Sequence, residues 1–218
     1  MASTTDFGRL AMFPLQSAFL PGEELPLQIF EPRYAEMVRD CLQDNNPRFG
    51  TVLISQGREV GGGDVRSDVG TVARITECVD IGGSGLFKLK CLTAERIKVC
   101  EWLPDDPYPR AVVQEWPDEP GDAVTAGQLE DLEDRMMALF ERIANARDFP
   151  VPPRDEVLGS AIDFSDAGER LYALASRIPI GPADRYSVLS APSAGARLTA
   201  LGEAVESVAA VIEFQLSE

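Results

Sequence analysis

Carboxylates are the side chains of this sequence that come closest to a catalytic arrangement. Glu23, Glu24 and Glu31 lie in the stretch "LPGEELPLQIFEPRY" at residues 20–34 and could form an acid and base pair. Such a pair needs an electropositive or apolar pocket that separates the pKa values of its two members. Because nothing in the sequence supplies that pocket, these residues give no positive evidence for catalysis.

A second acidic group, Glu130, Asp131, Glu133 and Asp134, lies in "GQLEDLEDR". The group stands near the start of a predicted helix, where the positive end of the helix dipole favours negative charge. We expect these carboxylates to form a solvated helix start rather than a metal site.

The chain lacks the groups on which most nucleophilic catalysis depends. It contains no histidine, which excludes a catalytic Ser-His-Asp triad and a catalytic Cys-His pair. No G-x-x-x-x-G-K-[ST] phosphate-binding loop occurs, and the glycine-rich stretches "GREVGGGD" and "IGGSGLFKL" do not follow the strand, loop and helix order of a dinucleotide site. We interpret both stretches as hairpin turns and expect no cofactor.

The four cysteines, Cys41, Cys78, Cys91 and Cys100, include no Cys-x-x-Cys pair. Without histidine, a tetrahedral zinc site would need all four thiols or additional carboxylates. We interpret the cysteines as reduced and mostly packed thiols, and we expect no metal site.

Aromatic residues around a proline-rich segment suggest a binding role. Trp102, Tyr108 and Arg110 lie in or beside "LPDDPYPR", whose three prolines make a rigid connection between two predicted strands. Rigid aromatic and arginine side chains at such a loop can anchor a protein partner. Alternatively, Trp102 and Trp116 close the ends of a core as ordinary packing residues, which is the commoner role of buried aromatics.

Charge limits the possible partners. Lys plus Arg total 20 against 36 Asp plus Glu, so the net charge of −16 disfavours nucleic acid. RNA binding would need a basic patch, for example around Arg58, Arg66 and Arg74. The N-terminus lacks a secretory pattern, and no stretch reaches the roughly 18 apolar residues of a membrane span. We expect a soluble, cytoplasmic protein with no membrane partner.

The first half of the chain predicts β structure. Short apolar runs separated by turn formers occur at 49–56, 69–81, 86–93, 94–103 and 108–116, which suits a small barrel or folded sheet. One helix interrupts them. It begins at Pro32 and places Tyr34, Met37, Val38 and Cys41 on one face.

The second half predicts helices. An acidic connector at 116–128 precedes a helix with the apolar stripe Leu129, Leu132, Met136, Leu139 and Ile143. Proline-rich residues 149–156 stop that helix and cannot themselves be helical. A helix around 165–178, a short helix opened by Pro182, and a last helix with Leu198, Leu201, Val205, Val208 and Ile212 follow. We therefore expect a β-rich domain at 1–117 and an α-helical bundle at 118–218.

The motif "MFPLQSAFLPGEELPLQIFEPRYAEMV" resembles the opening of the Lon protease N-terminal domain family. That family begins with an FPL strand, a proline-glycine turn, a second strand and a helix opened by F-E-P-R-Y. Further similarity covers the chain from about residue 10 to 215. Gln28 replaces a histidine of many relatives, and Arg96-Ile97 replaces a frequent arginine-phenylalanine pair. The resemblance implies an α+β fold, with a PUA-like pseudo-barrel followed by an α-helical bundle.

The resemblance also implies a function. In full-length Lon proteases this region precedes the ATPase and serine-lysine peptidase modules and helps capture substrate proteins. This sequence has no Walker motif and leaves no room for a peptidase domain, so the resemblance implies a stand-alone Lon N-terminal-domain protein. We expect a non-enzymatic module that binds unfolded segments or a specific protein or peptide partner. That partner could be a chaperone or a separate protease to which the module delivers substrates as an adaptor. The alternative is a small-molecule-binding protein or an unrecognised hydrolase that uses a carboxylate cluster.

Overall fold

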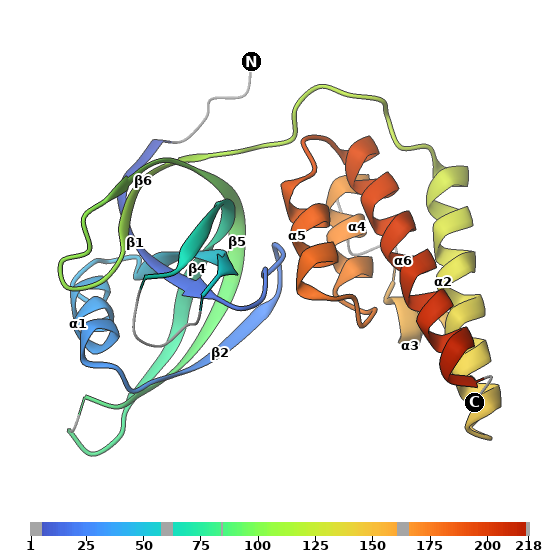
Figure 1. Ribbon diagram of the computed structural model, residues 1–218, viewed down its shortest axis with the longest axis horizontal. Helices are drawn as coiled ribbons and strands as arrows, with labels where there is room; N and C mark the ends of the chain where they lie inside the picture. Colours follow the sequence, from blue (N-terminus) through green and yellow to red (C-terminus); the bar gives the residue numbers. More distant parts are fainter. Residues whose placement is uncertain (1–5, 58–62, 84, 161–165, 217–218) are drawn as a thin grey trace. The chain divides into compact units, whose positions relative to one another are not determined.

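The computed structural model describes residues 6–57, 63–83, 85–160 and 166–216. The chain divides into two compact units, Met1–Pro117 and Asp118–Glu218 (Figure 1), which are described separately below. We call them the barrel unit and the helical unit.

The barrel unit is a mixed sheet that closes on itself. Its strands run in the order β2-β5-β4-β3-β1-β6, and β6 also pairs with β5, so that five strands form a ring and β2 lies outside it. The pair β1 and β3 is parallel, whereas the other pairs are antiparallel. The bounds are β1 Asp6–Leu15, β2 Glu24–Ile29, β3 Arg48–Gln56, β4 Val65–Asp80, β5 Phe87–Leu103 and β6 Arg110–Glu115. This uneven ring is the predicted pseudo-barrel.

Strand β5 takes part in both the ring and its extension. Its first half pairs with β2 and its second half with β6. The sequence predicted two strands at 86–93 and 94–103, and this prediction was wrong because the strand continues from Thr93 to Ala94 without a turn. A register shift between β4 and β5 at Thr71/Ala73 accommodates the change of partner within one continuous strand.

Helix α1, Pro32–Cys41, packs on the sheet with the predicted face. Tyr34, Met37, Val38 and Cys41 are all buried in one cluster with side chains of the sheet. A second cluster, which includes Met12, Val52, Val72, Ile97 and Val113, fills the barrel between β1, β3, β4, β5 and β6. The two clusters give the barrel unit its own core.

Strand β2 forms an edge of the sheet, as its proline predicted. The Thr93 N–H donates to the Glu23 carbonyl at 2.9 Å. Since hydrogen-bonded and non-bonded residues alternate along an antiparallel pair, the backbone of Pro26 faces away from β5. The missing N–H of Pro26 therefore costs no ladder bond, and it removes one donor from the open edge.

The helical unit contains the remaining helices of the described residues. They are α2 Ala126–Ala146, α3 Arg154–Leu158, α4 Ala167–Ala175, α5 Pro182–Ser190 and α6 Ala194–Leu216. Arg135 pairs with Glu206 and Arg142 with Glu213, so α2 and α6 run parallel, as Figure 1 also shows. None of the described helices is long and apolar enough to cross a membrane.

Two boundaries differ from the sequence prediction. Helix α2 starts inside the expected connector because Thr125 and Gln128 form a capping box at its N-terminus. Helix α3 starts at Arg154, inside the stretch 149–156 that was predicted to be non-helical. That prediction was wrong for its last residues, because the prolines end at Pro153, which is the N-cap, and leave every helical position after it free.

Candidate functional site

The structure places two of the predicted binding residues at the same end of the barrel, on either side of one loop. Trp102 lies near the end of β5 and Arg110 begins β6. They flank the last residue of β5, Leu103, and the connection at 104–109, which together we call the 103–109 loop. In the β5–β6 register Trp102 faces Ala111, and Leu103 faces Arg110. Because successive side chains of a strand point to opposite faces, Trp102 and Arg110 lie on opposite faces of this strand pair.

Trp102 is half-buried and joins the core to the surface. It packs against the barrel cluster that contains Met12 and Ile97. The guanidinium carbon of Arg66 lies 4.9 Å from the centroid of the Trp102 ring, which is within the range of a cation–π contact. The ring therefore has a packing role and also supports Arg66.

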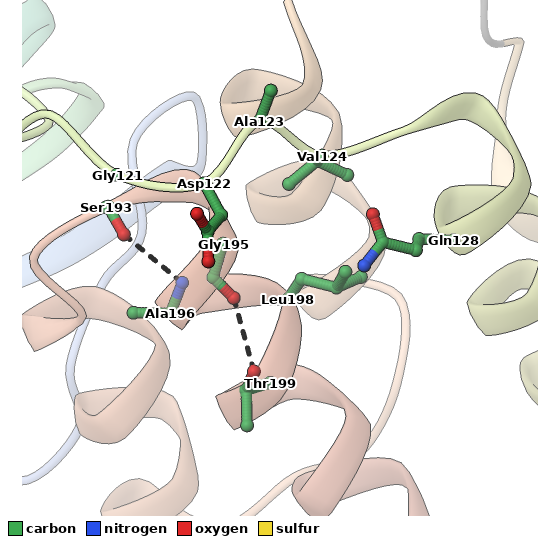
Figure 2. Close-up of a pocket in the computed structure, with 10 residues that line it drawn as sticks. All are labelled: Gly121, Asp122, Ala123, Val124, Gln128, Ser193, Gly195, Ala196, Leu198 and Thr199. Atoms are coloured by element: carbon green, nitrogen blue, oxygen red, sulfur yellow. Dashed lines mark hydrogen bonds between the residues drawn. The ribbon is translucent and has the colours of Figure 1, made fainter.

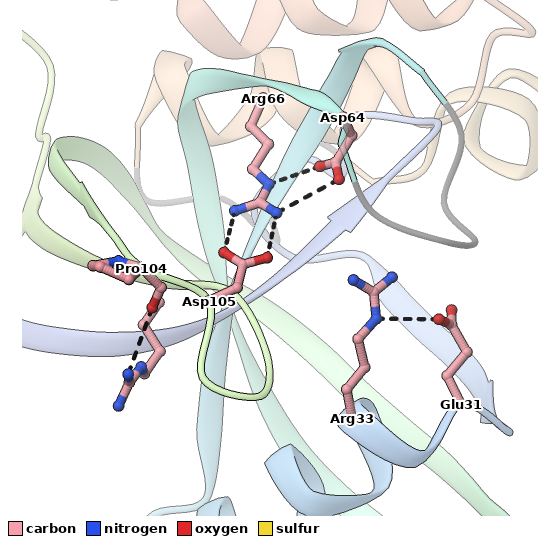
Figure 3. A network of polar contacts seen from close by, with 7 residues as sticks. Glu31, Arg33, Asp64, Arg66, Pro104 and Asp105 are labelled. Atoms are coloured by element: carbon pink, nitrogen blue, oxygen red, sulfur yellow. Dashed lines mark hydrogen bonds and ion pairs between the residues drawn. The ribbon is translucent and has the colours of Figure 1, made fainter.

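Arg66 fixes the 103–109 loop to β4, as Figure 3 shows. Its Nε donates to Asp64 Oδ2 at 2.7 Å, and its Nη1 and Nη2 donate to the two carboxylate oxygens of Asp105 at 3.0 and 2.8 Å. Burial favours a raised pKa at Asp64, but hydrogen bonds, above all from Arg66, and its positive charge outweigh burial and hold that pKa below its usual value. The loop is therefore held by a bidentate ion pair.

Arg110 touches the loop only weakly. Its Nη2 lies 3.5 Å from the Pro104 carbonyl oxygen and 3.4 Å from Asp106 Oδ2. The side chain of Arg110 is 37% exposed and that of Asp106 is 81% exposed. Because such exposed contacts are worth little, the Arg110 guanidinium can exchange them for a partner's groups at small cost.

Tyr108 lies inside the barrel unit rather than on its surface. It is 8% exposed, and its hydroxyl donates to Asp40 Oδ2 at 2.7 Å, which ties the loop to α1. Burial, followed by that hydrogen bond, raises the Tyr108 pKa. Substitution of Tyr108 should consequently disturb packing, so the residue cannot serve as a surface probe of binding.

The first carboxylate group does not assemble into a catalytic pair. Glu23 accepts the Leu20 N–H at 2.8 Å, Glu31 pairs with Arg33 at 3.1 Å, and Glu24 is exposed. Within the described ranges no group of three or more acidic or thiol side chains could hold a metal ion.

The second carboxylate group corrects the sequence interpretation at one residue. Glu130, Asp131 and Asp134 are exposed as predicted, but Glu133 is only 12% exposed and accepts from Arg170 at 2.7 Å. Its other carboxylate oxygen accepts from Arg154 at 3.0 Å. Glu133 thus joins α2 to α3 and α4 and is not part of a solvated helix face.

The cysteines and the arginine group provide no further site. All four thiols are free, and burial raises the pKa of Cys41 and of Cys91 to about 12. Of the three arginines considered for RNA, Arg58 lies outside the described residues. Arg66 is paired as above and Arg74 with Glu95. These two described arginines are therefore neutralised.

A pocket of about 490 Å³ lies in the helical unit, where the chain before α2 passes the start of α6 (Figure 2). Its lining contains a single carboxylate, Asp122. Ser193 Oγ accepts the Ala196 N–H at 3.3 Å, and Thr199 Oγ1 donates to the Gly195 carbonyl at 3.2 Å. The pocket offers no paired carboxylates for the alternative hydrolytic function.

The fold defines the class of the protein, an α+β chain with a pseudo-barrel unit followed by a helical unit. The chain belongs to the ATP-dependent protease La (LON) substrate-binding domain family, whose model matches residues 9–207. The predicted resemblance is therefore confirmed. No curated protein matches the chain.

Two solved structures resemble the chain over most of its length. A Lon N-terminal domain protein from Xanthomonas campestris has a TM-score of 0.62 and 25% identity, and the alignment covers 88% of this chain and 96% of that chain. The N-terminal domain of the Mycobacterium avium complex Lon protease has a TM-score of 0.64 and 15% identity, with 91% and 98% covered. At that lower identity the second likeness concerns the fold alone.

Proposed function

We propose that the chain is a non-catalytic module that binds protein or peptide segments through the 103–109 loop, with Trp102 and Arg110 on either side of it. The observation that carries this proposal is membership of the LON substrate-binding domain family over residues 9–207. The geometry of the loop supports the choice of surface. Its residues 104–107 are exposed. Arg66 on β4 binds the loop through Asp105, and Tyr108 of the loop binds Asp40 on α1.

A loop held in this way loses little conformational freedom when a partner binds. Ordering a rotamer-rich interface costs about 0.5–1.5 kcal/mol per immobilised side chain, so a loop that is already fixed retains more of its contact energy. Arg110 adds a partly exposed guanidinium, a group that is frequent among residues that dominate binding. Together they fit recognition of an exposed segment of another protein.

Fluorescence anisotropy with a labelled, reduced and carboxymethylated polypeptide tests the proposal. We expect the intact chain to bind this unfolded probe and Arg110→Ala to weaken binding at least about fivefold, the effect of losing an anchor worth more than 1 kcal/mol. Trp102→Leu should also weaken binding while it keeps an apolar side chain on the core. The control is Lys88→Ala, which removes an exposed basic side chain at the start of β5, away from the connection between β5 and β6.

The outcomes separate the function from the surface. Absence of binding by the intact chain contradicts the proposed function. Binding that Arg110→Ala and Trp102→Leu both retain contradicts the proposed surface. Circular dichroism of each variant must match that of the intact chain, which shows that weaker binding does not reflect unfolding.

The same binding activity would serve an adaptor that delivers substrates to a separate protease, or a factor that works with a chaperone in quality control. Affinity purification from the native extract, followed by mass spectrometry, tests this role. A protease or chaperone that is retained by the intact chain and lost by Arg110→Ala supports it. A partner-free chain that carries a small molecule favours the alternative ligand-binding function.

A further inference from the structure

Trp116, the residue that follows β6, anchors the end of the barrel unit to β5. The Trp116 N–H donates to the Arg96 carbonyl at 2.8 Å, and Arg96 Nε donates back to the Trp116 carbonyl at 2.9 Å. The Arg96 guanidinium also lies 4.1 Å from the centroid of the Trp116 ring, and Arg96 is 5% exposed. Trp116 is therefore tied to β5 through both of its backbone groups.

The start of the helical unit is anchored equally closely. Asp118 accepts from Arg197 through both carboxylate oxygens, at 3.0 and 2.5 Å, and Arg197 is 1% exposed. The Arg197 guanidinium also lies 3.8 Å from the ring centroid of Tyr172. The next residue, Glu119, donates its N–H to the Pro192 carbonyl at 2.8 Å. Asp118 and Glu119 thus belong to the body of the helical unit.

Close backbone packing continues that anchorage to Asp122, where the chain crosses the start of α6 in Figure 2. A Cβ atom added to Gly121 would lie 2.8 Å from Ser193, and one added to Gly195 would lie 3.0 Å from the Asp122 carbonyl oxygen. Neither glycine could carry a side chain without a shift of its neighbour. The segment 118–122 is consequently fitted to α6, although its acidic, Pro- and Gly-containing composition is typical of a linker.

We propose that the connection between the two units is a single-residue joint at Pro117. It is the one residue between the Arg96 anchor of Trp116 and the Arg197 anchor of Asp118, and it is exposed. Its ring fixes φ, so rotation at the joint is left mainly to the Pro117 ψ angle. Trp116 moves with the barrel unit, and residues 118–122 move with the helical unit.

Residual dipolar couplings and ¹⁵N relaxation of the whole chain test the joint. We expect the couplings of the two units to require two alignment tensors, with Trp116 fitting that of the barrel unit and Glu119, Gly121 and Asp122 fitting that of the helical unit. The order parameters of these three amides should be about 0.85, as in α2 and α6. One common tensor for both units overturns the joint. Order parameters below about 0.6 at 119–122 overturn the anchorage.

A pair of variants tests the anchor itself. Asp118→Asn removes the charge that pairs with Arg197 but keeps a side-chain oxygen that can accept from its guanidinium, so the helical unit should stay folded. We expect the order parameters of Glu119 and Gly121 to fall in Asp118→Asn and to stay unchanged in Asp122→Asn, the matched control. Unchanged order parameters in both variants contradict the role of the Asp118–Arg197 ion pair.

Discussion

The barrel unit and the helical unit bury polar side chains in different ways. Among the described residues of the barrel unit, the buried polar side chains are the hydroxyls of Thr51, Thr71 and Thr93, together with Arg96. Where the structure describes the helical unit, they are Arg170 and Arg197, and both pair with carboxylates.

The difference follows from the backbone. A sheet joins its strands through main-chain hydrogen bonds, so short hydroxyls suffice to complete the few remaining contacts. Helices satisfy their main chains internally, and their side chains must make every connection between elements. The helical unit should therefore depend on ion pairs far more than the barrel unit does.

The largest expected effect is at Glu133, the carboxylate shared by two arginines. Glu133→Ala leaves the guanidinium of Arg170, whose side chain is 4% exposed, without its carboxylate. Breaking such a buried pair costs about 3–5 kcal/mol of unfolding free energy. Urea denaturation followed by circular dichroism at 222 nm measures it. Asp131→Ala on the exposed face of α2 is the control, within about 0.5 kcal/mol of the unchanged chain. Equal losses in both variants would contradict the comparison.

A smaller loss is expected where the barrel unit uses a hydroxyl. Thr93 Oγ1 donates to the Leu20 carbonyl at 2.5 Å and accepts the Glu23 N–H at 2.8 Å. Thr93→Val removes the hydroxyl and leaves these buried backbone groups without it, which should lower the free energy of unfolding by about 1–3 kcal/mol. Tryptophan fluorescence during denaturation measures it, since both tryptophans lie in the barrel unit. Thr76→Val, at an exposed hydroxyl, should change the midpoint little. A loss as large as that of Glu133→Ala would remove the distinction between the units.

Asp64→Asn should lower the free energy of unfolding by up to about 1 kcal/mol, and this loss should depend on pH. Because the folded-state pKa of Asp64 lies below its unfolded value of about 3.9, its ion pair with Arg66 stabilises the barrel unit above that value and is lost as pH falls through the folded pKa. The fluorescence-detected midpoint of Asp64→Asn should lie below that of the unchanged chain at pH 7, and the gap should close below about pH 4. A gap independent of pH would argue against the ion pair.

The smallest expected effect is a gain at the end of α2. Asp148 has φ of 57°, and Phe149 N–H donates to the Ala144 carbonyl at 2.9 Å, the geometry of a Schellman cap. Glycine adopts this conformation without strain, so Asp148→Gly should raise stability by about 0.5 kcal/mol. Asp148→Ala should lower it, because alanine lacks the local hydrogen bonding that helps aspartate there. The circular dichroism midpoint distinguishes the two, and a gain in both would refute the strain argument.

Local patterns predicted most of the fold. The face Tyr34, Met37, Val38 and Cys41 and the edge position of Pro26 follow from helical and strand geometry alone. The continuity of β5 did not follow, because the apolar runs on either side of Thr93 look the same whether or not a turn separates them.

The supports of the site could not be predicted in the same way. Trp102 and Arg110 were predicted as binding residues because an aromatic and an arginine flank a proline-rich loop, and that prediction remains to be tested. Arg66 and Asp105 are 39 positions apart, and Glu133 and Arg170 are 37 apart, so only the tertiary register brings each pair together. Tyr108 shared the composition of the loop, yet its contact with Asp40 places it in the core.

The most direct test of the account is a map of where an unfolded polypeptide touches the barrel unit. The amide signals of the ¹⁵N-labelled chain are followed by NMR while the carboxymethylated probe is added. The account predicts the largest chemical-shift changes at Trp102, at Arg110 and along the 103–109 loop. Shift changes confined to the helical unit, or none at all, would contradict it.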